Sequence, residues 1–280
     1  MKNLLITTLV ITAIHTGITS VSSVFANEPT LQILSAADVE WGALNPARGD
    51  ASPRAANLWG DRESDSASGF LVKFVDGFSS PPHIHNITYR GIVISGLVHN
   101  DDPAAEKMWL PAGSFWVQPA GEVHITSAEG DHNMAYIEID SGPYLVQPES
   151  EAFDNGERPV NVHSSNFVWL NAEDIKWLPT SGSEAETAFL WGERGENKLN
   201  GTLLKLPSGF SGEIQNNASE FHAVVIKGPV TLFEGELTAG SYFGLKSQQT
   251  IPIESGADVE NILYIRANNR YHLMQTSTSP

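Results

Sequence analysis

The sequence predicts an all-β protein that contains two copies of one domain. Short runs rich in β-branched and aromatic residues recur along the chain between Gly, Pro, Asn and Asp, for example at 70–74, 91–94 and 223–226. After the first residues, no stretch sustains an apolar period of 3.6 residues for long. The chain also repeats itself, as shown below. Many short strands in each copy favour a β-sandwich or a jelly roll, and the interior of a jelly roll can hold a site.

Composition restricts the classes of function. The chain has 280 residues, is 41% hydrophobic and carries a formal net charge of −17. Such a charge argues against a nucleic-acid partner, because phosphate binding needs clustered Lys and Arg. The chain contains no cysteine. Disulfides and thiolate metal sites are therefore excluded, and a bound metal must be held by nitrogen and oxygen.

The first 26 residues resemble a signal peptide. Lys2 provides a positive start, residues 4–14 form an apolar run, and residues 24–26 suit a signal peptidase. We expect cleavage after Ala26. A membrane anchor is the alternative, but the run is too short to span a bilayer. The prediction is a periplasmic or secreted protein that has no membrane attachment after cleavage.

Two long segments of the chain match each other without gaps. Residues 58–60, Leu-Trp-Gly, return at 190–192, and residues 77–79, Gly-Phe-Ser, return at the same offset at 209–211. Chance would not keep such a register over this length. An internal repeat fixes the number of domains, and here it predicts two.

The repeat sets the expected domain boundaries. The first copy would cover residues 28–150 and the second residues 160–275, with a linker at 151–159. The segment from 147 to 159 is polar and rich in turn formers, so we interpret it as a solvated connector.

Two histidines stand two residues apart in a predicted strand. His83 and His85 would point to the same face of that strand. Two aligned imidazoles can form half of a metal site, and His124 follows about forty residues later. The alternative is that the three histidines are separately hydrogen-bonded. Without partners, each buried imidazole would cost about 1–3 kcal/mol, and a metal ion removes that cost.

The spacing around these histidines resembles the two sequence motifs of the cupin superfamily. The matching residues are Gly77, His83, His85 and Gly96 in the first motif, and Gly113, Pro119, Gly121 and His124 in the second. The resemblance implies a double-stranded β-helix, which is a jelly roll, and the repeat makes the chain similar to a bicupin. The chain also resembles exported bacterial two-cupin proteins without assigned function and, more distantly, the zinc-binding cupin domain of anti-sigma factors.

This resemblance implies one divalent metal ion held by His83, His85 and His124. Neutral imidazoles suit Zn, Fe, Mn, Ni or Cu, and a three-histidine site leaves a position open. We expect metal retention to weaken as the pH falls through about 6.5, where free imidazole takes up its proton.

The chain departs from the family pattern at the acidic ligand. The places where that ligand would stand hold Tyr89 and Arg90. Tyr89 keeps strand parity with the histidine pair, whereas Arg90 could bind an anionic substrate or support the site. Glu122, two residues before His124, could replace the missing carboxylate. The fourth ligand therefore stays open between Tyr89, Glu122 and water.

The second copy lacks the three histidines. In register, the places of His83, His85 and His124 hold Gln215, Asn217 and Ile251. We interpret this copy as a structural or interaction domain with a degenerate site. A second, metal-free binding pocket is the alternative.

Two functions remain open. The first is a metal-dependent enzyme acting on a small molecule in the barrel, for example a dioxygenase or an isomerase. The second is a non-catalytic module that binds or senses a ligand or a metal. The fold does not decide between them, and the sequence also leaves a homodimer open.

Overall fold

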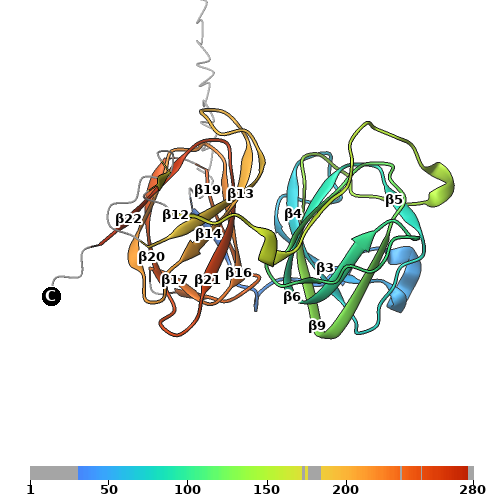
Figure 1. Ribbon diagram of the computed structural model, residues 1–280, viewed down its shortest axis with the longest axis horizontal. Helices are drawn as coiled ribbons and strands as arrows, with labels where there is room; N and C mark the ends of the chain where they lie inside the picture. The colour runs from blue at the N-terminus through green and yellow to red at the C-terminus, as the bar shows by residue number, and fades with distance from the viewer. Residues whose placement is uncertain (1–30, 172–173, 176–183, 234, 247, 277–280) are drawn as a thin grey trace, which may run out of the picture.

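The protein is almost entirely β in the structure. This structure, a computed structural model, describes the whole chain except residues 1–30, 172–173, 176–183, 234, 247 and 277–280. The expected signal peptide, residues 1–26, therefore lies outside the described residues. Figure 1 shows two halves side by side, with the N-terminal half in blue to green and the C-terminal half in orange to red.

The N-terminal half is built on one antiparallel sheet. Eight strands form it within the described residues, in the order β11-β8-β6-β9-β4-β3-β2, with β7 paired to β6. The strands are β2 (Gly42–Ala43), β3 (Arg54–Trp59), β4 (Ser68–Phe74), β6 (Tyr89–Asp101), β7 (Leu110–Pro111), β8 (Phe115–Gln118), β9 (Ile125–Ile139) and β11 (Val160–Val162). A separate pair joins β5 (His83–His85) to β10 (Val146–Pro148). The short 3-10 turns are η1 (Pro46–Ala51), η2 (Glu149–Glu151) and η3 (Ser164–Asn166).

The C-terminal half contains two antiparallel sheets. Among the described residues, the larger one has seven strands in the order β1-β19-β16-β21-β14-β13-β12, and the smaller one has five in the order β18-β17-β20-β15-β22. The larger sheet comprises β1 (Leu31–Leu34), β12 (Leu170–Asn171), β13 (Glu186–Gly192), β14 (Asn200–Leu206), β16 (Phe221–Lys227), β19 (Tyr242–Leu245) and β21 (Asn261–Ala267). The smaller one comprises β15 (Ser211–Asn216), β17 (Val230–Leu232), β18 (Gly235–Leu237), β20 (Gln249–Ser255) and β22 (Tyr271–Gln275).

Each half gives one strand to the other. β1 precedes the whole N-terminal half in the chain, yet it pairs with β19 of the C-terminal half, Leu31 opposite Leu245. β11 follows the connecting segment, yet it pairs with β8 of the N-terminal half, Val160 opposite Val117. Backbone hydrogen bonds therefore tie each half to a segment that the sequence assigns to the other.

Alternation of apolar and polar residues in the strands produces three hydrophobic clusters. One fills the N-terminal half around Phe70 and Trp116, and another fills the C-terminal half around Phe221 and Phe243. The third lies between the halves and combines residues of both, such as Leu71 and Val224. Burial of this third cluster joins the halves through the hydrophobic effect.

This architecture matches the predicted jelly-roll fold class. The sheets are antiparallel, and the strand pairs recorded for the described residues run as open sheets, which do not close into a ring.

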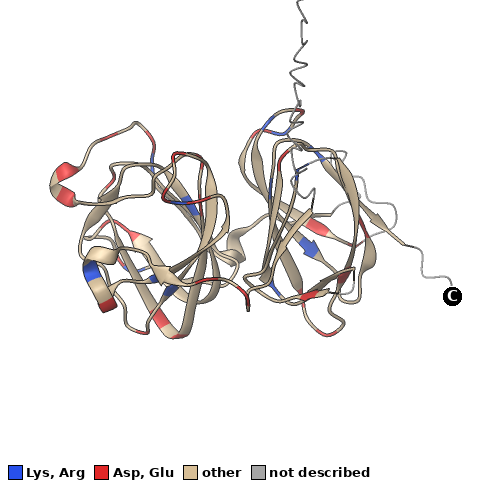
Figure 2. Ribbon diagram, turned by 180° about the vertical axis from the view of Figure 1, so that it is seen from behind, with Lys and Arg blue, Asp and Glu red and all other residues tan. Residues whose placement is uncertain are grey.

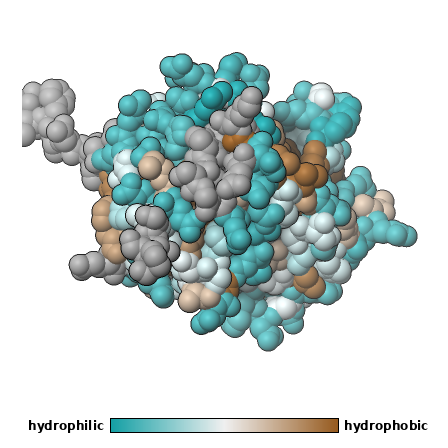
Figure 3. All heavy atoms as spheres, turned by 60° about the vertical axis from the view of Figure 1, so that its left-hand side comes forward, coloured by the Kyte–Doolittle hydropathy of each residue, from teal (hydrophilic) through white to brown (hydrophobic). Residues whose placement is uncertain are grey.

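The face of the molecule drawn in Figure 3 is mainly hydrophilic. Acidic residues are spread over both halves in Figure 2, and the face in Figure 3 shows hydrophobic side chains only in small groups. No helix among the described residues has the length and the apolar character needed to cross a membrane.

A buried polar network crosses the boundary between the halves. Two tryptophans at matching places of the repeat donate from Nε1 to tyrosine hydroxyls: Trp59 to Tyr136 at 3.0 Å and Trp191 to Tyr264 at 2.9 Å. Both hydroxyls donate to the carboxylate of Glu138, at 3.2 Å and 2.8 Å. Glu138 is 1% exposed and accepts from both halves.

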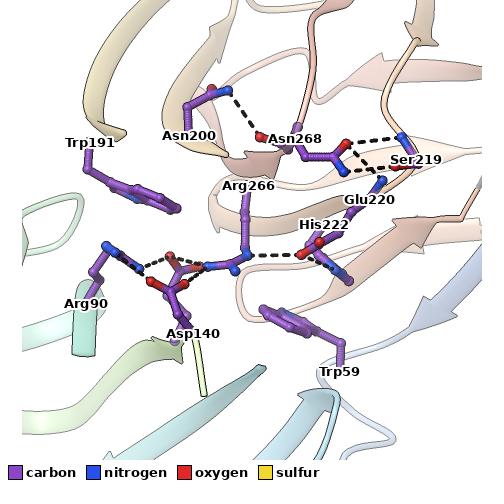
Figure 4. Close-up of polar contacts among 12 residues, drawn as sticks. Trp59, Arg90, Asp140, Trp191, Asn200, Ser219, Glu220, His222, Arg266 and Asn268 are labelled. Atoms are coloured by element: carbon purple, nitrogen blue, oxygen red, sulfur yellow. Dashed lines mark hydrogen bonds and ion pairs between the residues drawn. The ribbon is translucent and has the colours of Figure 1, made fainter. Parts of the chain in front are cut away.

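Two arginines complete this network (Figure 4). The Nη1 atom of Arg266 lies 3.4 Å from Glu138 and 2.7 Å from Asp140, and Arg90 contacts the same two carboxylates at 3.6 Å and 2.9 Å. The Arg90 guanidinium lies 3.7 Å from the ring centre of Trp191. Burial alone would raise the pKa of Asp140, but the hydrogen bond and charge of Arg90, together with Arg266, hold it below its usual value. Each arginine therefore forms ion pairs with both carboxylates, although the buried Nη1 atom of Arg90 makes no hydrogen bond.

We predict that Glu138→Ala lowers the free energy of unfolding by about 3 kcal/mol. The change leaves two buried tyrosine hydroxyls without their acceptor and leaves Asp140 as the one carboxylate that the two arginines share. Urea unfolding followed by circular dichroism measures the loss. The control is Glu193→Ala, which removes an exposed ion pair with Lys198 and should change stability by less than about 1 kcal/mol. Equal losses in the two variants would contradict a special role for Glu138.

Candidate metal centre

The three predicted histidines meet at one place in the N-terminal half. His83 and His85 lie on β5, and His124 directly precedes β9. Reciprocal backbone hydrogen bonds of 3.1 Å and 3.0 Å join His83 to His124. The ring centres are 4.3 Å, 5.1 Å and 5.3 Å apart, and all three residues are buried. Strand parity therefore brought the pair to one face, as the sequence predicted.

Backbone carbonyls fix the orientation of every imidazole. The Nδ1 atoms of His83, His85 and His124 lie 2.9 Å, 2.9 Å and 3.0 Å from the carbonyl oxygens of residues 81, 145 and 122. A carbonyl oxygen only accepts, so each Nδ1 carries the proton and each Nε2 keeps its lone pair. Histidines that bind metal usually donate their other ring N–H to a carbonyl or carboxylate oxygen in this way.

The donor set fits a metal ion. One potential ligand atom from each histidine lies within 4.8 Å of the others. Three neutral imidazoles offer nitrogen donors with no carboxylate, a set suited to a divalent ion such as Fe or Cu. The carboxylate of Glu122 does not join this group. Of the expected candidates for the fourth ligand, Tyr89 and water remain.

Burial keeps the three imidazoles neutral. It lowers the pKa of His124 to about 3, helped by the charge of His83, and it lowers the pKa of His85 well below 6.5, helped by the other two histidines. Burial also lowers the pKa of His83. The expected loss of metal near pH 6.5 assumed a free imidazole and needs correction. Protons compete with the ion only at lower pH.

Two phenols face the remaining lone pairs. The hydroxyl of Tyr89 lies 3.3 Å from Nε2 of His124, and the hydroxyl of Tyr144 lies 3.1 Å from Nε2 of His85. Burial raises the pKa of both phenols. Both phenols are therefore neutral. The Tyr89 hydroxyl donates its proton to Asn100 Oδ1 at 3.0 Å, so Tyr144 is the phenol that can donate a hydrogen bond close to the position of an ion.

Tyr144 was missed by sequence reasoning because it belongs to no motif and lies far from the histidines in the chain. It precedes β10, which pairs with β5, Val146 opposite His85. The following segment stays against the site, since Phe153 donates from its backbone to Gly121 at 3.1 Å. At Gly121 φ is +76°, and an added Cβ would lie 2.3 Å from the Phe153 oxygen. The segment expected to be a solvated connector is exposed over residues 148–158, and its first residues, 147–149, line the cavity beside the histidines.

Arg90 takes no part in the site. It follows Tyr89 in β6, so its side chain points to the opposite face, where it pairs with Asp140 at 2.9 Å. The possibility that Arg90 binds a substrate at the histidines is therefore wrong, since successive strand residues face opposite sides.

A cavity of about 460 Å³ opens beside the histidines. His83, His85 and Tyr144 line it, and η1 and η2 also contribute lining residues. Both turns lie at the end of the N-terminal half that faces away from the C-terminal half (Figure 2). The volume suffices for a small organic molecule.

The corresponding place in the C-terminal half is apolar. Ile214 pairs with Ile251, as His83 pairs with His124, and both isoleucines are buried. The sequence register had placed Gln215 at the position of His83. In the structure Gln215 is half-buried and lies opposite Thr250. A shift of one residue exchanges the faces of a strand, which explains the difference.

Solved structures share this fold. A candidate dioxygenase from Nostoc punctiforme is similar with a TM-score of 0.66 and 17% identity, covering 86% of this chain and 83% of that chain. Protein YlbA from E. coli, of family DUF861, is similar with a TM-score of 0.56 and 14% identity, and the match covers 85% of this chain and 90% of that chain. Quercetin 2,3-dioxygenase from Acinetobacter baumannii is similar with a TM-score of 0.54 and 15% identity, and the match covers 89% of this chain and 85% of that chain.

These similarities establish the fold. No curated protein sequence matches the chain. A family model described as a domain of unknown function, DUF4437, matches residues 32–274. Because this match covers most of the sequence, the chain belongs to the DUF4437 family.

Proposed function

We propose that the protein is a metal-dependent enzyme that binds one divalent ion through His83, His85 and His124 and acts on a small molecule. The observation that carries the proposal is the convergence of three imidazoles whose Nδ1 atoms are all held by backbone carbonyls. One potential ligand atom of each histidine lies within 4.8 Å of the others, an arrangement that separate roles in the fold would not require.

The residues around the histidines suit catalysis at an open metal position. Tyr144 lines the cavity and can orient a ligand by a hydrogen bond from its neutral hydroxyl. A bound divalent ion would supply Lewis acidity and, if it is iron or copper, redox chemistry. The dioxygenases of similar fold make an oxygenase-like reaction the first candidate.

The alternative is a binding or sensing module. The missing carboxylate ligand favours it, because a site of three neutral imidazoles suits zinc as well as it suits redox metals. A fourth protein ligand would close the site and leave no place for a substrate. The cavity at His83 and His85 favours the enzyme.

We further propose an exported bicupin. The signal peptide at 1–26 would be removed. Residues 28–150 and 160–275 would form two cupin domains that exchange strands β1 and β11, and residues 151–159 would link them. The ion would be held by the first domain alone. The apolar pair of Ile214 and Ile251 supports this assignment, since neither side chain can bind a metal.

We predict that His83→Ala or His124→Ala abolishes stoichiometric metal binding while the protein stays folded. Elemental analysis measures the metal, and circular dichroism checks the fold. His99→Ala is the matched control, since His99 is also buried but lies outside the histidine group. Gln215→Ala should likewise keep the metal. Full metal content in either site variant would contradict the assignment.

We predict that the metal stays bound when the pH falls from 7 to about 5. The lowered pKa values keep the folded imidazoles neutral in this range, whereas free imidazole is mostly protonated there. In the metal-free protein the unfolded chain takes up these protons first, so stability declines as the pH falls below about 6.5. Dialysis at graded pH, followed by elemental analysis, measures retention. Loss of half of the bound metal near pH 6.5 would show that burial does not keep the imidazoles neutral.

We predict that azide binds to the copper- or cobalt-loaded protein and shifts its visible spectrum, because the ion has a position open to the cavity. Titration in an absorption spectrometer follows the shift, and His124→Ala provides the background. An unchanged spectrum in the fully loaded protein would indicate a closed set of four protein ligands and would favour the binding module.

A further inference from the structure

The cavity beside the histidines contains one strong cation. Arg48 is the only Lys or Arg among its lining residues. No carboxylate of the described residues lies within ion-pair distance of this guanidinium, although the chain carries a net charge of −17. An arginine available in an otherwise acidic protein is a natural partner for an anion.

The backbone around Arg48 is held in place. Arg48 belongs to η1, where the side chain of Asn45 accepts from Ala47 at 3.1 Å and the backbone of Asn45 donates to Ser52 Oγ at 2.8 Å. The guanidinium lies 5.9 Å from the ring centre of Phe78. A capped turn and an aromatic ring therefore limit where the charge can lie.

The rest of the cavity is largely apolar. Phe74 and Phe78 pack together with ring centres 5.3 Å apart, and Leu44, Pro82 and Val146 add further apolar surface. Such walls suit an aromatic or otherwise apolar body. The cavity is also lined by polar residues, which include Arg48, Tyr144 and the histidines of β5.

The charge balance favours one negative charge on the ligand. A single arginine can bind one carboxylate through two parallel hydrogen bonds. Glu149 also lines the cavity and is exposed, so it would repel a second negative charge. A phosphate dianion would need more cations than the cavity offers.

We propose that the cavity takes a small organic monoanion, an apolar or aromatic body with one carboxylate that binds the Arg48 guanidinium while the body reaches toward His83 and His85. This inference names the substrate class of the proposed enzyme and so rests on the proposed function. Arg48 is a specificity residue in this scheme and contacts no metal ligand in the described contacts.

Calorimetric binding of 2-naphthoate and its neutral counterpart 2-naphthamide tests the proposal. We expect the metal-loaded protein to bind the carboxylate at least about ten-fold more tightly than the amide. Arg48→Gln should remove this preference, and Arg48→Lys should restore part of it. Arg158→Gln is the matched control, because Arg158 is exposed, pairs with Asp154 and lies outside the cavity lining.

A carboxylate that bound only to the metal would bind Arg48→Gln as tightly as the unaltered protein, and this result would overturn the proposal. Equal affinity for naphthoate and naphthamide would also overturn it. Elemental analysis of the same samples shows whether the metal is bound. A wrong assignment of Arg48 can therefore be distinguished from a wrong assignment of the metal site. Repeating the titrations on metal-free protein measures how much Arg48 contributes to the affinity for the carboxylate when no ion is bound.

Discussion

The buried carboxylate of Glu138 is the contact on which the arrangement of the two halves depends. In its sheet Glu138 lies opposite Gly69 and Arg90, and Arg266 lies opposite Gly201 and His222 at the matching place of the other half. Identical copies would bring like charges together here. Divergence of the repeat placed an acid in one copy and a base in the other, so the charges attract where symmetry would have made them repel.

The geometry of the histidine site depends on a few contacts with the backbone. The backbone sets each imidazole tautomer, so no additional acidic side chain is needed to orient the ligands. The segment after β9 provides one of these carbonyls as well as Tyr144. Because this segment also lines the cavity, the geometry of the metal ligands and the shape of the ligand pocket are coupled through one stretch of backbone.

The sequence predicted those features that depend on local pattern. Alternation and turn residues revealed the β class, and the motif spacing identified His83, His85 and His124 as a group. The features that it missed depend on contacts between distant segments. Tyr144 reaches His85 only through the pairing of β10 with β5, and Ile214 replaces Gln215 because an ungapped alignment cannot detect a slip of one residue. The pKa of a histidine likewise depends on burial, which no motif encodes.

The exchange of β1 and β11 has a consequence for dissecting the protein. A fragment that stops at the connecting segment would keep a strand whose neighbour is gone, and would expose the edge of β8 that β11 covers. Unpaired edges invite aggregation. The two copies in the sequence are thus not the units into which the molecule can be cut, and useful truncations would have to carry each borrowed strand along with its host sheet.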